Sequence, residues 1–527
     1  MTGPHLAAEE DTEAVRDPRI VVVGAGIGGL CAAADLAARG LDVTLVERAA
    51  APGGKMREVR VAGQPVDSGP TVLTMRAVFD DLFEHAGERL DDHLRLVPAA
   101  VLARHAWVEG GRLDLFADLE RSAAAIGELS GRAEGDRYLA FCRRARGIFE
   151  TLDRTFIRAP LPNPVSLSWR VGLHRPGALW GIQPFRTLWG LLGEHFRDPR
   201  LRQLFGRYAT YCGSSPFDAP ATLALVAHVE QAGVWFVDGG MHRLAAALAA
   251  LVARRGGTLR FNTAAQGLLV ERGRIAGVAL GDGTRLAAEA VVLNADTAAL
   301  AAGLFGNDTA RAAPPPKRVE RSLSAVTWSM HAVAGGFPLL RHTVFFSSDY
   351  PDEFDAIFRR GELPREPTVY VCAQDRGDAD RPVAGGAERL MCLVNAPPTG
   401  DAGAPTDAEL DRCEARTFSL LERCGLAVER RPEATVRTGP ADFERLFPAT
   451  GGALYGRASH GWRSAFARPG SRSRVPGLYL AGGSVHPGPG VPMAAVSGRL
   501  AAASLAEDLG TTSRSRTVAM PGGTSTR

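Results

Sequence analysis

The sequence predicts an α/β protein built on a buried parallel sheet. Residues 20–23 form an unbroken β-branched run, which is typical of a parallel strand covered on both faces. A glycine-rich turn and a helix of small and apolar residues, 27–38, follow directly, and a second strand, 43–46, ends at the acid Glu47. Because strand, turn, helix, strand and acid stand in this order, the glycines indicate a dinucleotide site rather than a chance turn.

The turn reads Gly24-Ala25-Gly26 and continues to Gly29. Gly24 allows the tight turn, Gly26 lets the backbone approach a pyrophosphate, and Gly29 lets the helix pack closely on the strand. The helix N-terminus adds N–H groups and a positive dipole. Glu47 is expected to hold a ribose 2′-hydroxyl, and an acid at this position disfavours the 2′-phosphate of NADP.

The residues after Glu47 favour a second contact with the same ligand. Arg48 is followed by two adjacent glycines, of which Gly54 is the second, and by Lys55. Glycines beside a cation permit a close approach to phosphate or ring oxygens, and a typical NAD domain has no such extension. Thr71 and Val72 lie in an apolar segment after Gly69-Pro70 that would run along a flavin ring. An ordinary hairpin turn is the alternative for this segment.

The middle of the chain has a helical pattern between about 94 and 241, then strands with glycine turns from 256 to 296, then alternating strands and helices from 298 to 475. The helical part carries three tryptophans among arginines, a composition that suits a surface helix entering a lipid headgroup layer. Core or lid tryptophans with solvated arginines are the alternative. The residues concerned are Trp169, Trp180 and Trp189, with Arg170, Arg175, Arg186 and Arg197.

The C-terminal part returns to the pattern of a ligand-binding turn. After a strand at 477–481, Gly482 and Gly483 permit close backbone approach, and a helix of small residues opens near 491. Its N–H groups would point at a bound cofactor. The helix opening consists of Val491, Pro492 and Met493.

His486 is a histidine within this loop, and it is our candidate for a catalytic residue. The alternative for His486 is a loop histidine that hydrogen-bonds to the backbone.

Composition restricts the partners. The chain has 527 residues and a net charge of +3, from 61 basic and 58 acidic residues that are interspersed, so nucleic acid is not expected as a partner. Seven scattered cysteines without a CxxC pair favour a reducing, cytoplasmic compartment and no metal site. The N-terminus does not read as a secretory signal, and no segment sustains the roughly 20 apolar residues that span a bilayer.

Three longer blocks, 67–98, 204–244 and 479–502, together with the glycine turns, carry a family resemblance. The chain resembles the FAD-containing amine oxidase and phytoene desaturase superfamily. Within it, the chain looks like bacterial carotenoid desaturases, most of all those of phototrophic bacteria that act on 1-hydroxy or 1-methoxy carotenoids. The resemblance runs from about Arg19 to Gly510.

The resemblance implies a Rossmann-like FAD-binding domain of the amine oxidase and phytoene desaturase type, an α+β substrate domain and a helical membrane-associating region. It places backbone atoms near Ala265 against adenine, and the turn from Asn294 to Asp296 near the cofactor. The expected parts are an N-terminus without structure at 1–17, FAD-binding segments at 18–97, 241–297 and 476–510, a helical and substrate region with membrane contact at 98–240, a substrate domain at 298–475 and a tail without structure at 511–527.

The function implied is an FAD-dependent desaturase that introduces a C-3,4 double bond into acyclic 1-hydroxy or 1-methoxy carotenoids. The enzyme would lie peripherally on the cytoplasmic side of a bilayer and pass electrons to oxygen or a quinone. Three alternatives stay open: a phytoene-type desaturase that introduces several double bonds, a non-catalytic isoprenoid carrier of the Rab escort type, and a polar-amine oxidase.

Overall fold

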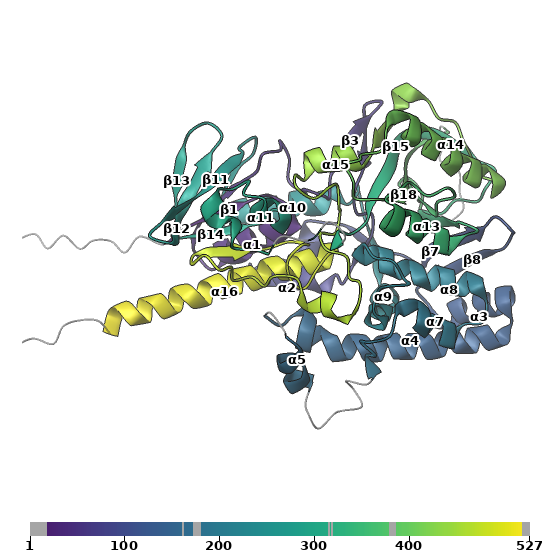
Figure 1. Ribbon diagram of the computed structural model, residues 1–527, viewed down its shortest axis with the longest axis horizontal. Coiled ribbons are helices and arrows are strands. Elements are labelled where there is room, and N and C mark those ends of the chain that lie inside the picture. Colours follow the sequence, from purple (N-terminus) through teal and green to yellow (C-terminus); the bar gives the residue numbers. More distant parts are fainter. Residues whose placement is uncertain are drawn as a thin grey trace, which may run out of the picture.

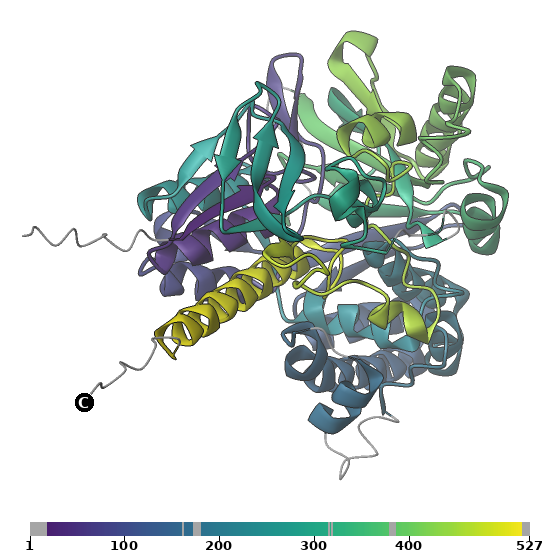
Figure 2. The same cartoon turned by 60° about the vertical axis from the view of Figure 1, so that its left-hand side comes forward.

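The computed structural model describes residues 18–160, 163–171, 181–314, 317, 320–378 and 386–518, with side chains as far as 510. Figures 1 and 2 show a parallel sheet with its helices, a second large sheet, and a group of helices below the second sheet. The structure confirms the α/β class expected from the sequence.

The first sheet has five parallel strands in the order β10-β2-β1-β14-β21. Its strands come from three remote parts of the chain. They are β1 (Arg19–Val23), β2 (Asp42–Val46), β10 (Thr258–Arg260), β14 (Ala290–Leu293) and β21 (Leu478–Leu480). All four side chains of β14 are buried, as its unbroken apolar run predicts.

Helices cover one face of this sheet and a small antiparallel sheet covers the other. The helices are α1 (Ile27–Ala38), α2 (Ala77–His85), α10 (His242–Arg254) and α16 (Val491–Val518). The antiparallel strands are β11 (Ala265–Glu271), β12 (Arg274–Leu280) and β13 (Arg285–Ala287). Where α1 crosses α16 the backbones touch, because a Cβ on Gly498 would lie 2.0 Å from the Gly28 carbonyl oxygen.

The second sheet has eight strands, with the path β19-β15-β18-β17-β16-β7-β8 and β20 paired to β15. They are β7 (Val101–Trp107), β8 (Arg112–Phe116), β15 (Ser324–Gly335), β16 (His342–Phe346), β17 (Val369–Ala373), β18 (Ala387–Ala396), β19 (Ala427–Val428) and β20 (Thr435–Thr438). The expected start of the helical and substrate region at 98 is compatible with this sheet. The hairpin of β7 and β8 belongs to the substrate sheet, since β7 pairs with β16 in parallel.

Alternation along these strands creates two faces. Val326, Trp328 and Met330 of β15 pack toward α14 (Asp407–Arg423) in one apolar cluster. Thr327 of β15 and Met391 of β18 face the other way and line a cavity. Because successive side chains of a strand point to opposite faces, the same strands supply both a core and a cavity wall.

The remaining helices lie mostly between 119 and 231 and pack in one cluster with part of the second sheet. They are α3 (Leu119–Ser130), α4 (Arg132–Leu152), α5 (Pro164–Val171), α7 (Leu188–His195), α8 (Pro199–Gly206) and α9 (Leu225–Gln231). Short helices elsewhere are α11 (Thr297–Ala301), α12 (Asn307–Ala310), α13 (Tyr350–Asp355) and α15 (Pro440–Leu446). Single turns are η1 (Leu90–Asp92), η2 (Asp153–Ile157), η3 (Arg207–Cys212), η4 (Ala221–Ala224), η6 (Ala356–Arg360), η7 (Pro432–Ala434) and η8 (Trp462–Phe466).

A hairpin and a small three-stranded sheet complete the fold. They are the hairpin of β3 (Glu58–Val61) and β4 (Gln64–Asp67), and the sheet formed by β5 (Leu73–Thr74), β9 (Val234–Val237) and β6 (Leu96–Pro98).

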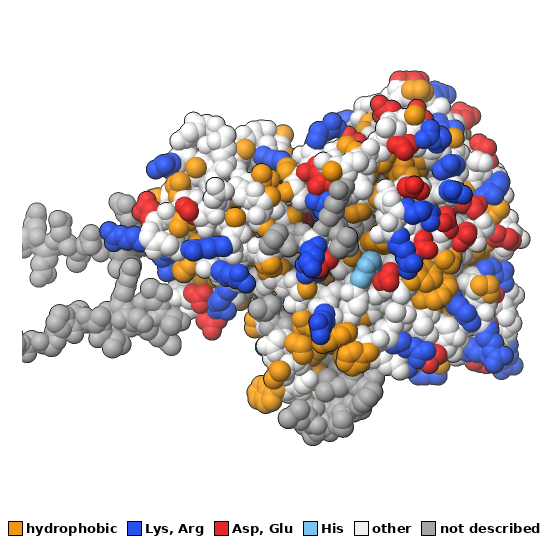
Figure 3. All heavy atoms as spheres, viewed as in Figure 1, with side chains coloured by type: hydrophobic (Ala, Val, Ile, Leu, Met, Phe, Trp, Pro, Cys, Tyr) orange, Lys and Arg blue, Asp and Glu red, His pale blue; other side chains and the backbone are white. Residues whose placement is uncertain are grey.

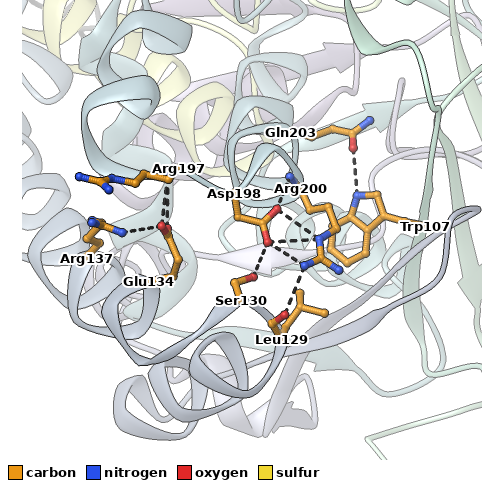
Figure 4. A network of polar contacts seen from close by, with 9 residues as sticks. All are labelled: Trp107, Leu129, Ser130, Glu134, Arg137, Arg197, Asp198, Arg200 and Gln203. Carbon is orange, nitrogen blue, oxygen red and sulfur yellow. Dashed lines mark hydrogen bonds and ion pairs between the residues drawn. The ribbon is translucent and has the colours of Figure 1, made fainter.

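Buried polar contacts join the helical region to the second sheet. The Trp107 indole donates to Gln203 of α8 at 2.9 Å, and Gln203 donates to the Ser347 carbonyl at 2.6 Å. Figure 4 shows this contact beside Asp198, whose carboxylate caps the N-terminus of α8 through the Arg200 amide at 2.8 Å. A satisfied buried hydrogen bond fixes one arrangement of the two parts, because breaking it strands a polar group away from water.

The C-terminal boundary also differs from the expectation. The helix α16 continues to Val518 instead of ending near Gly510, since no proline interrupts residues 493–518, and it extends outward from the body in Figure 1. The expected tails at 1–17 and 519–527, and the residues Arg175 and Trp180, lie outside the described residues. Within the described residues, no helix has the length and hydrophobicity needed to cross a bilayer.

Candidate functional site

Three turns meet at the carboxyl edge of the parallel sheet. The Gly24 turn follows β1, Asn294 follows β14, and Gly482 follows β21. In open parallel sheets this edge is where ligands bind. Segments separated by hundreds of residues therefore form one cradle.

The Asn294 side chain lies in the space that glycines leave open. A Cβ on Gly26 would lie 2.7 Å from its Nδ2 atom, and a Cβ on Gly28 or Gly482 would lie 2.7 Å from its Oδ1 atom. The Nδ2 atom donates to the Gly24 carbonyl at 3.2 Å. Glycine is thus required at these positions because the backbone lies close to another group, as expected for Gly26. That group is the Asn294 side chain, and Gly26 also lines the cavity.

Gly29 and Ala25 support the turn from behind. A Cβ on Gly29 would lie 2.0 Å from the Gly24 carbonyl oxygen, which accounts for the close helix–strand packing expected at this position. The Ala25 amide donates to Glu47 Oε2 at 2.7 Å, and the Ala49 amide donates to Oε1 at 2.8 Å. Glu47 is therefore held at the end of β2, and a carboxylate has further lone pairs that can accept from a ribose hydroxyl.

The expected second approach is also present. The Gly53 amide donates to the Ala25 carbonyl at 2.8 Å. The next residue, Gly54, then lies so close to the first turn that a Cβ on Gly54 would be 3.1 Å from the Gly26 Cα. Lys55 donates to the Leu454 carbonyl at 2.6 Å, and burial lowers the pKa of its ammonium group. Arg48 donates to the Leu446 carbonyl. Both cations therefore have backbone partners at the cavity wall.

One cavity of about 830 Å³ runs from this cradle to the second sheet. Most of the residues expected to bind the cofactor line it. They are Gly24, Gly26, Glu47, Arg48, Gly54, Lys55, Thr71, Val72, Ala265, Asn294, Asp296, Gly482, Gly483, Val491, Pro492 and Met493. The N-termini of α1 and α16 open onto it, so both donors and dipoles suit a pyrophosphate. These residues fit FAD.

One acidic and one hydroxyl side chain near the cradle, Asp296 and Ser484, have hydrogen-bond partners within the protein. Asp296 caps α11 by accepting from the Ala298 amide at 3.0 Å. Ser484 accepts from the Thr297 amide at 3.1 Å. Arg468 fixes the glycine loop by donating to the Gly483 carbonyl at 3.0 Å. No sequence motif pointed to Arg468.

His486 does not take the position expected of a catalytic residue. It is absent from the residues that line the cavity, and its Nε2 atom donates to the carbonyls of Phe156 at 2.9 Å and Ala159 at 3.0 Å. The Phe156 ring packs edge-on against it at 5.0 Å. This placement favours the alternative, a histidine that joins the C-terminal loop to the helical region, over the catalytic role.

The sequence also missed a group of buried and half-buried polar residues on the cavity wall. These side chains lie in apolar surroundings without any motif spacing, and only the fold brings them together. They are Arg207, Tyr211, Glu230, Tyr350, Glu353 and Tyr370. Burial raises the pKa of Glu353 to about 7, although hydrogen bonds from Thr368 and Asn395 lower it. Within the described residues, no cluster of side chains has the composition of a metal site.

The buried position of His486 predicts a pH dependence of stability. Burial lowers its pKa to about 4, whereas an unfolded chain protonates histidine near pH 6.5. The unfolded state therefore binds more protons below pH 6.5, so the contribution of His486 is complete above pH 6.5 and is lost as the pH falls toward 4. We expect the free energy of unfolding to fall between pH 7.5 and 4.5 by about 2 kcal/mol more in the wild type than in His486→Gln.

Denaturant titrations of both proteins at the two pH values measure this difference. Glu271→Gln, a change at an exposed side chain, serves as the control and should follow the wild type. Equal pH slopes for wild type and His486→Gln would contradict the buried, neutral state of His486.

Comparison with known proteins agrees with the geometry. The family model described as "Flavin containing amine oxidoreductase" matches residues 27–506. The chain is 56% identical to the hydroxyneurosporene desaturase of Rubrivivax gelatinosus over 98% of both chains. It is 45% identical to the protein of the same name from Cereibacter sphaeroides, over 94% of this chain and 99% of that one.

A solved oxidoreductase from Methanosarcina mazei has a similar fold, with a TM-score of 0.57 and 17% identity over 93% of this chain and all of the other. The extent of these matches and the glycine cradle lead to one conclusion. The chain belongs to the flavin containing amine oxidoreductase family, in its carotenoid desaturase branch, and is an FAD-dependent oxidoreductase.

Proposed function

We propose that this protein introduces a C-3,4 double bond into acyclic 1-hydroxy or 1-methoxy carotenoids. Support comes from relatives named hydroxyneurosporene desaturase that are 56%, 45% and 43% identical to it. The structural observation that carries the proposal is the single cavity that joins the cofactor cradle to a wall of the substrate sheet. A hydrocarbon chain placed there would lie against the cofactor and out of water.

Bound FAD supplies an electron-deficient ring that accepts a hydride from an alkyl carbon. The protein positions the chain and excludes water. Met391 and Leu393 of β18, and Leu223 and Val226 of the helical region, present apolar side chains to the cavity. Holding a substrate in one orientation against the cofactor is the main contribution that such walls make to rate.

The three alternatives have less support. The cavity and the intact glycine cradle argue against a carrier without flavin chemistry. Phytoene desaturases from fungi match at 28% identity, well below the proteins named hydroxyneurosporene desaturase. The polar-amine oxidase alternative has only the fold in its favour, because the solved putrescine oxidases share 13–14% identity with this chain.

We further propose that the cavity mouth docks on a bilayer, where an apolar carotenoid resides. That the protein binds the cytoplasmic side of this bilayer stays a prediction. Val165, Trp169 and Phe185 are 80%, 75% and 77% exposed. Figure 3 shows apolar side chains in the lower part of the view, where Figure 1 labels α5. Leu167 lies on α5 with Val165 and Trp169 and lines the cavity, and Phe185 packs against Trp462, another lining residue, at 5.4 Å between ring centres. Exposed aromatic residues beside a greasy channel suit insertion into headgroups.

Charge at these residues should weaken membrane binding. Trp169→Glu combined with Phe185→Glu removes apolar contact and adds repulsion from anionic lipid, so we expect at least tenfold weaker binding to anionic vesicles in a sedimentation assay. Val97→Glu, at a residue that is 41% exposed and lies in β6, is the matched control and should bind as the wild type does. Unchanged binding of the double variant would contradict docking through this surface.

The substrate assignment predicts anaerobic bleaching of the flavin. The purified protein should be yellow, and 1-hydroxyneurosporene should bleach it because the hydride reduces the ring, leaving a carotenoid with a longer polyene absorption. Phytoene should bleach it far more slowly. Readmission of oxygen or of a quinone to separate samples identifies the electron acceptor by the return of the yellow colour. A protein that phytoene bleaches as fast as 1-hydroxyneurosporene would favour the phytoene-type alternative.

A further inference from the structure

The cavity wall opposite the cradle carries an unexpected group of polar side chains for a channel that takes a carotenoid. Arg207 of η3 donates to the Tyr211 hydroxyl at 2.8 Å, and its guanidinium carbon lies 5.1 Å and 5.3 Å from the ring centres of Tyr211 and Tyr370. Tyr350 and Glu353 line the same cavity. A purely hydrocarbon ligand would leave such groups without new partners, at a cost for each group.

Among the described residues, the Tyr350 hydroxyl has no hydrogen-bond partner. Its side chain is only 4% exposed, and the hydroxyl oxygen is buried and unsatisfied. The ring is held by Phe354 at 5.0 Å, Trp189 at 6.0 Å and Phe217 at 6.3 Å between ring centres. Since buried polar groups in native proteins nearly always have a partner, this fixed donor on a cavity wall indicates an acceptor on the bound ligand.

Glu353 stands three residues after Tyr350 on α13, so the two side chains share one face of the helix. Its Oε2 atom accepts from the Thr368 amide at 3.1 Å and hydroxyl at 2.6 Å, and its Oε1 atom accepts from Asn395 at 3.1 Å. The carboxylate is therefore fixed, and each oxygen retains capacity to accept a hydrogen bond from a hydroxyl.

The chemistry of the reaction sets where the substrate oxygen must lie. With about 1.5 Å for each carbon–carbon bond, an oxygen on C-1 lies within about 5 Å of the C-3,4 bond. Its binding group must therefore adjoin the place of the reacting ring. Thr71, in the segment expected along that ring, makes a 2.6 Å hydrogen bond with the Tyr370 hydroxyl. Tyr370 in turn lies against Arg207, which links the polar group to this segment.

We infer that Tyr350 donates a hydrogen bond to the C-1 oxygen of the substrate, with Glu353 and Arg207 completing a polar end of the cavity. Hydroxy and methoxy oxygens both accept this bond, whereas only the hydroxyl can also donate to Glu353. The polyene then extends from this end along the apolar walls. This inference rests on the proposed function and names the residues that select its substrates.

Tyr350→Phe tests the assignment because it deletes one oxygen and retains the ring. In the wild type, kcat/KM for 1-hydroxyneurosporene should exceed that for neurosporene, the hydrocarbon without the oxygen. The variant should lower this ratio about tenfold, which corresponds to one lost hydrogen bond. The methoxy substrate should lose the same factor, since its oxygen accepts from the same donor. Neurosporene turnover should stay within twofold of the wild type.

Tyr138→Phe is the matched control. Tyr138 is equally buried, donates to Gln231 at 3.0 Å and lies outside the cavity lining. It should leave the substrate ratio unchanged but lower the thermal midpoint, because it removes a satisfied hydrogen bond. Tyr350→Phe should leave the midpoint of the ligand-free protein unchanged or raise it, because it removes an unsatisfied hydroxyl. A marked fall in that midpoint would mean that the Tyr350 hydroxyl already has a partner, and would overturn the inference.

Binding without turnover gives a second measurement. With the flavin reduced beforehand, quenching of tryptophan fluorescence by the polyene reports the dissociation constant of each carotenoid. Tyr350→Phe should raise it about tenfold for 1-hydroxyneurosporene and leave it unchanged for neurosporene. An unchanged constant for both carotenoids would overturn the inference. If the wild type oxidises no hydroxycarotenoid at all, the proposed function fails; if it oxidises one and Tyr350→Phe retains the wild-type ratio, only this inference fails.

Discussion

The side chain of Asn294 occupies the space that the glycines of two loops leave open, and the cofactor cradle depends on this contact. Its amide touches the positions where Gly26, Gly28 and Gly482 would carry a Cβ, and it donates to the Gly24 carbonyl. The three strands that lead to these turns are neighbours in one parallel sheet, so the contact joins remote parts of the chain at the ligand-binding edge. Any larger residue at these glycines would separate the loops.

The position of the second sheet follows from the same edge. The Asp67 carboxylate, at the end of β4, accepts from the Met241 amide at 2.6 Å. The Asp67 amide donates to the side chain of Gln374, which directly follows β17, and the Gln374 side chain donates to the Asp67 carbonyl. The cavity therefore begins at the cradle and ends on strands whose opposite faces are packed core. A rigid wall on one side and a cofactor edge on the other are what a reaction on one carbon–carbon bond of a long chain requires.

The sequence allowed some parts of this site to be predicted and not others. The turn from Gly24 to Glu47 was predictable because its strands, helix and acid are contiguous and follow local rules of pattern and close approach. Gly482 was predictable as part of a ligand-binding turn, but the place of Asn294 came only from the family resemblance, since no local rule brings Asn294 and Gly482 together.

Tyr350 and Arg207 were missed, because an isolated tyrosine or arginine carries no signal until the fold places it on a cavity wall. His486 misled for the same reason: its residue type was visible, but the carbonyls of Phe156 and Ala159 that it faces were not. The pairing of the β7–β8 hairpin with β16 was not predicted either, because it is a long-range contact.

The affinity for FAD of Asn294→Asp tests the central claim most directly. The change keeps the shape of the side chain but replaces the donor to the Gly24 carbonyl with a charged oxygen beside the pyrophosphate site. Isothermal titration of FAD into the Asn294→Asp apoprotein should give a dissociation constant at least about tenfold above that of the wild type. The control Asn307→Asp, at an exposed residue outside the cavity lining, should leave the dissociation constant unchanged. A wild-type dissociation constant for a folded Asn294→Asp protein would contradict the account of the cradle.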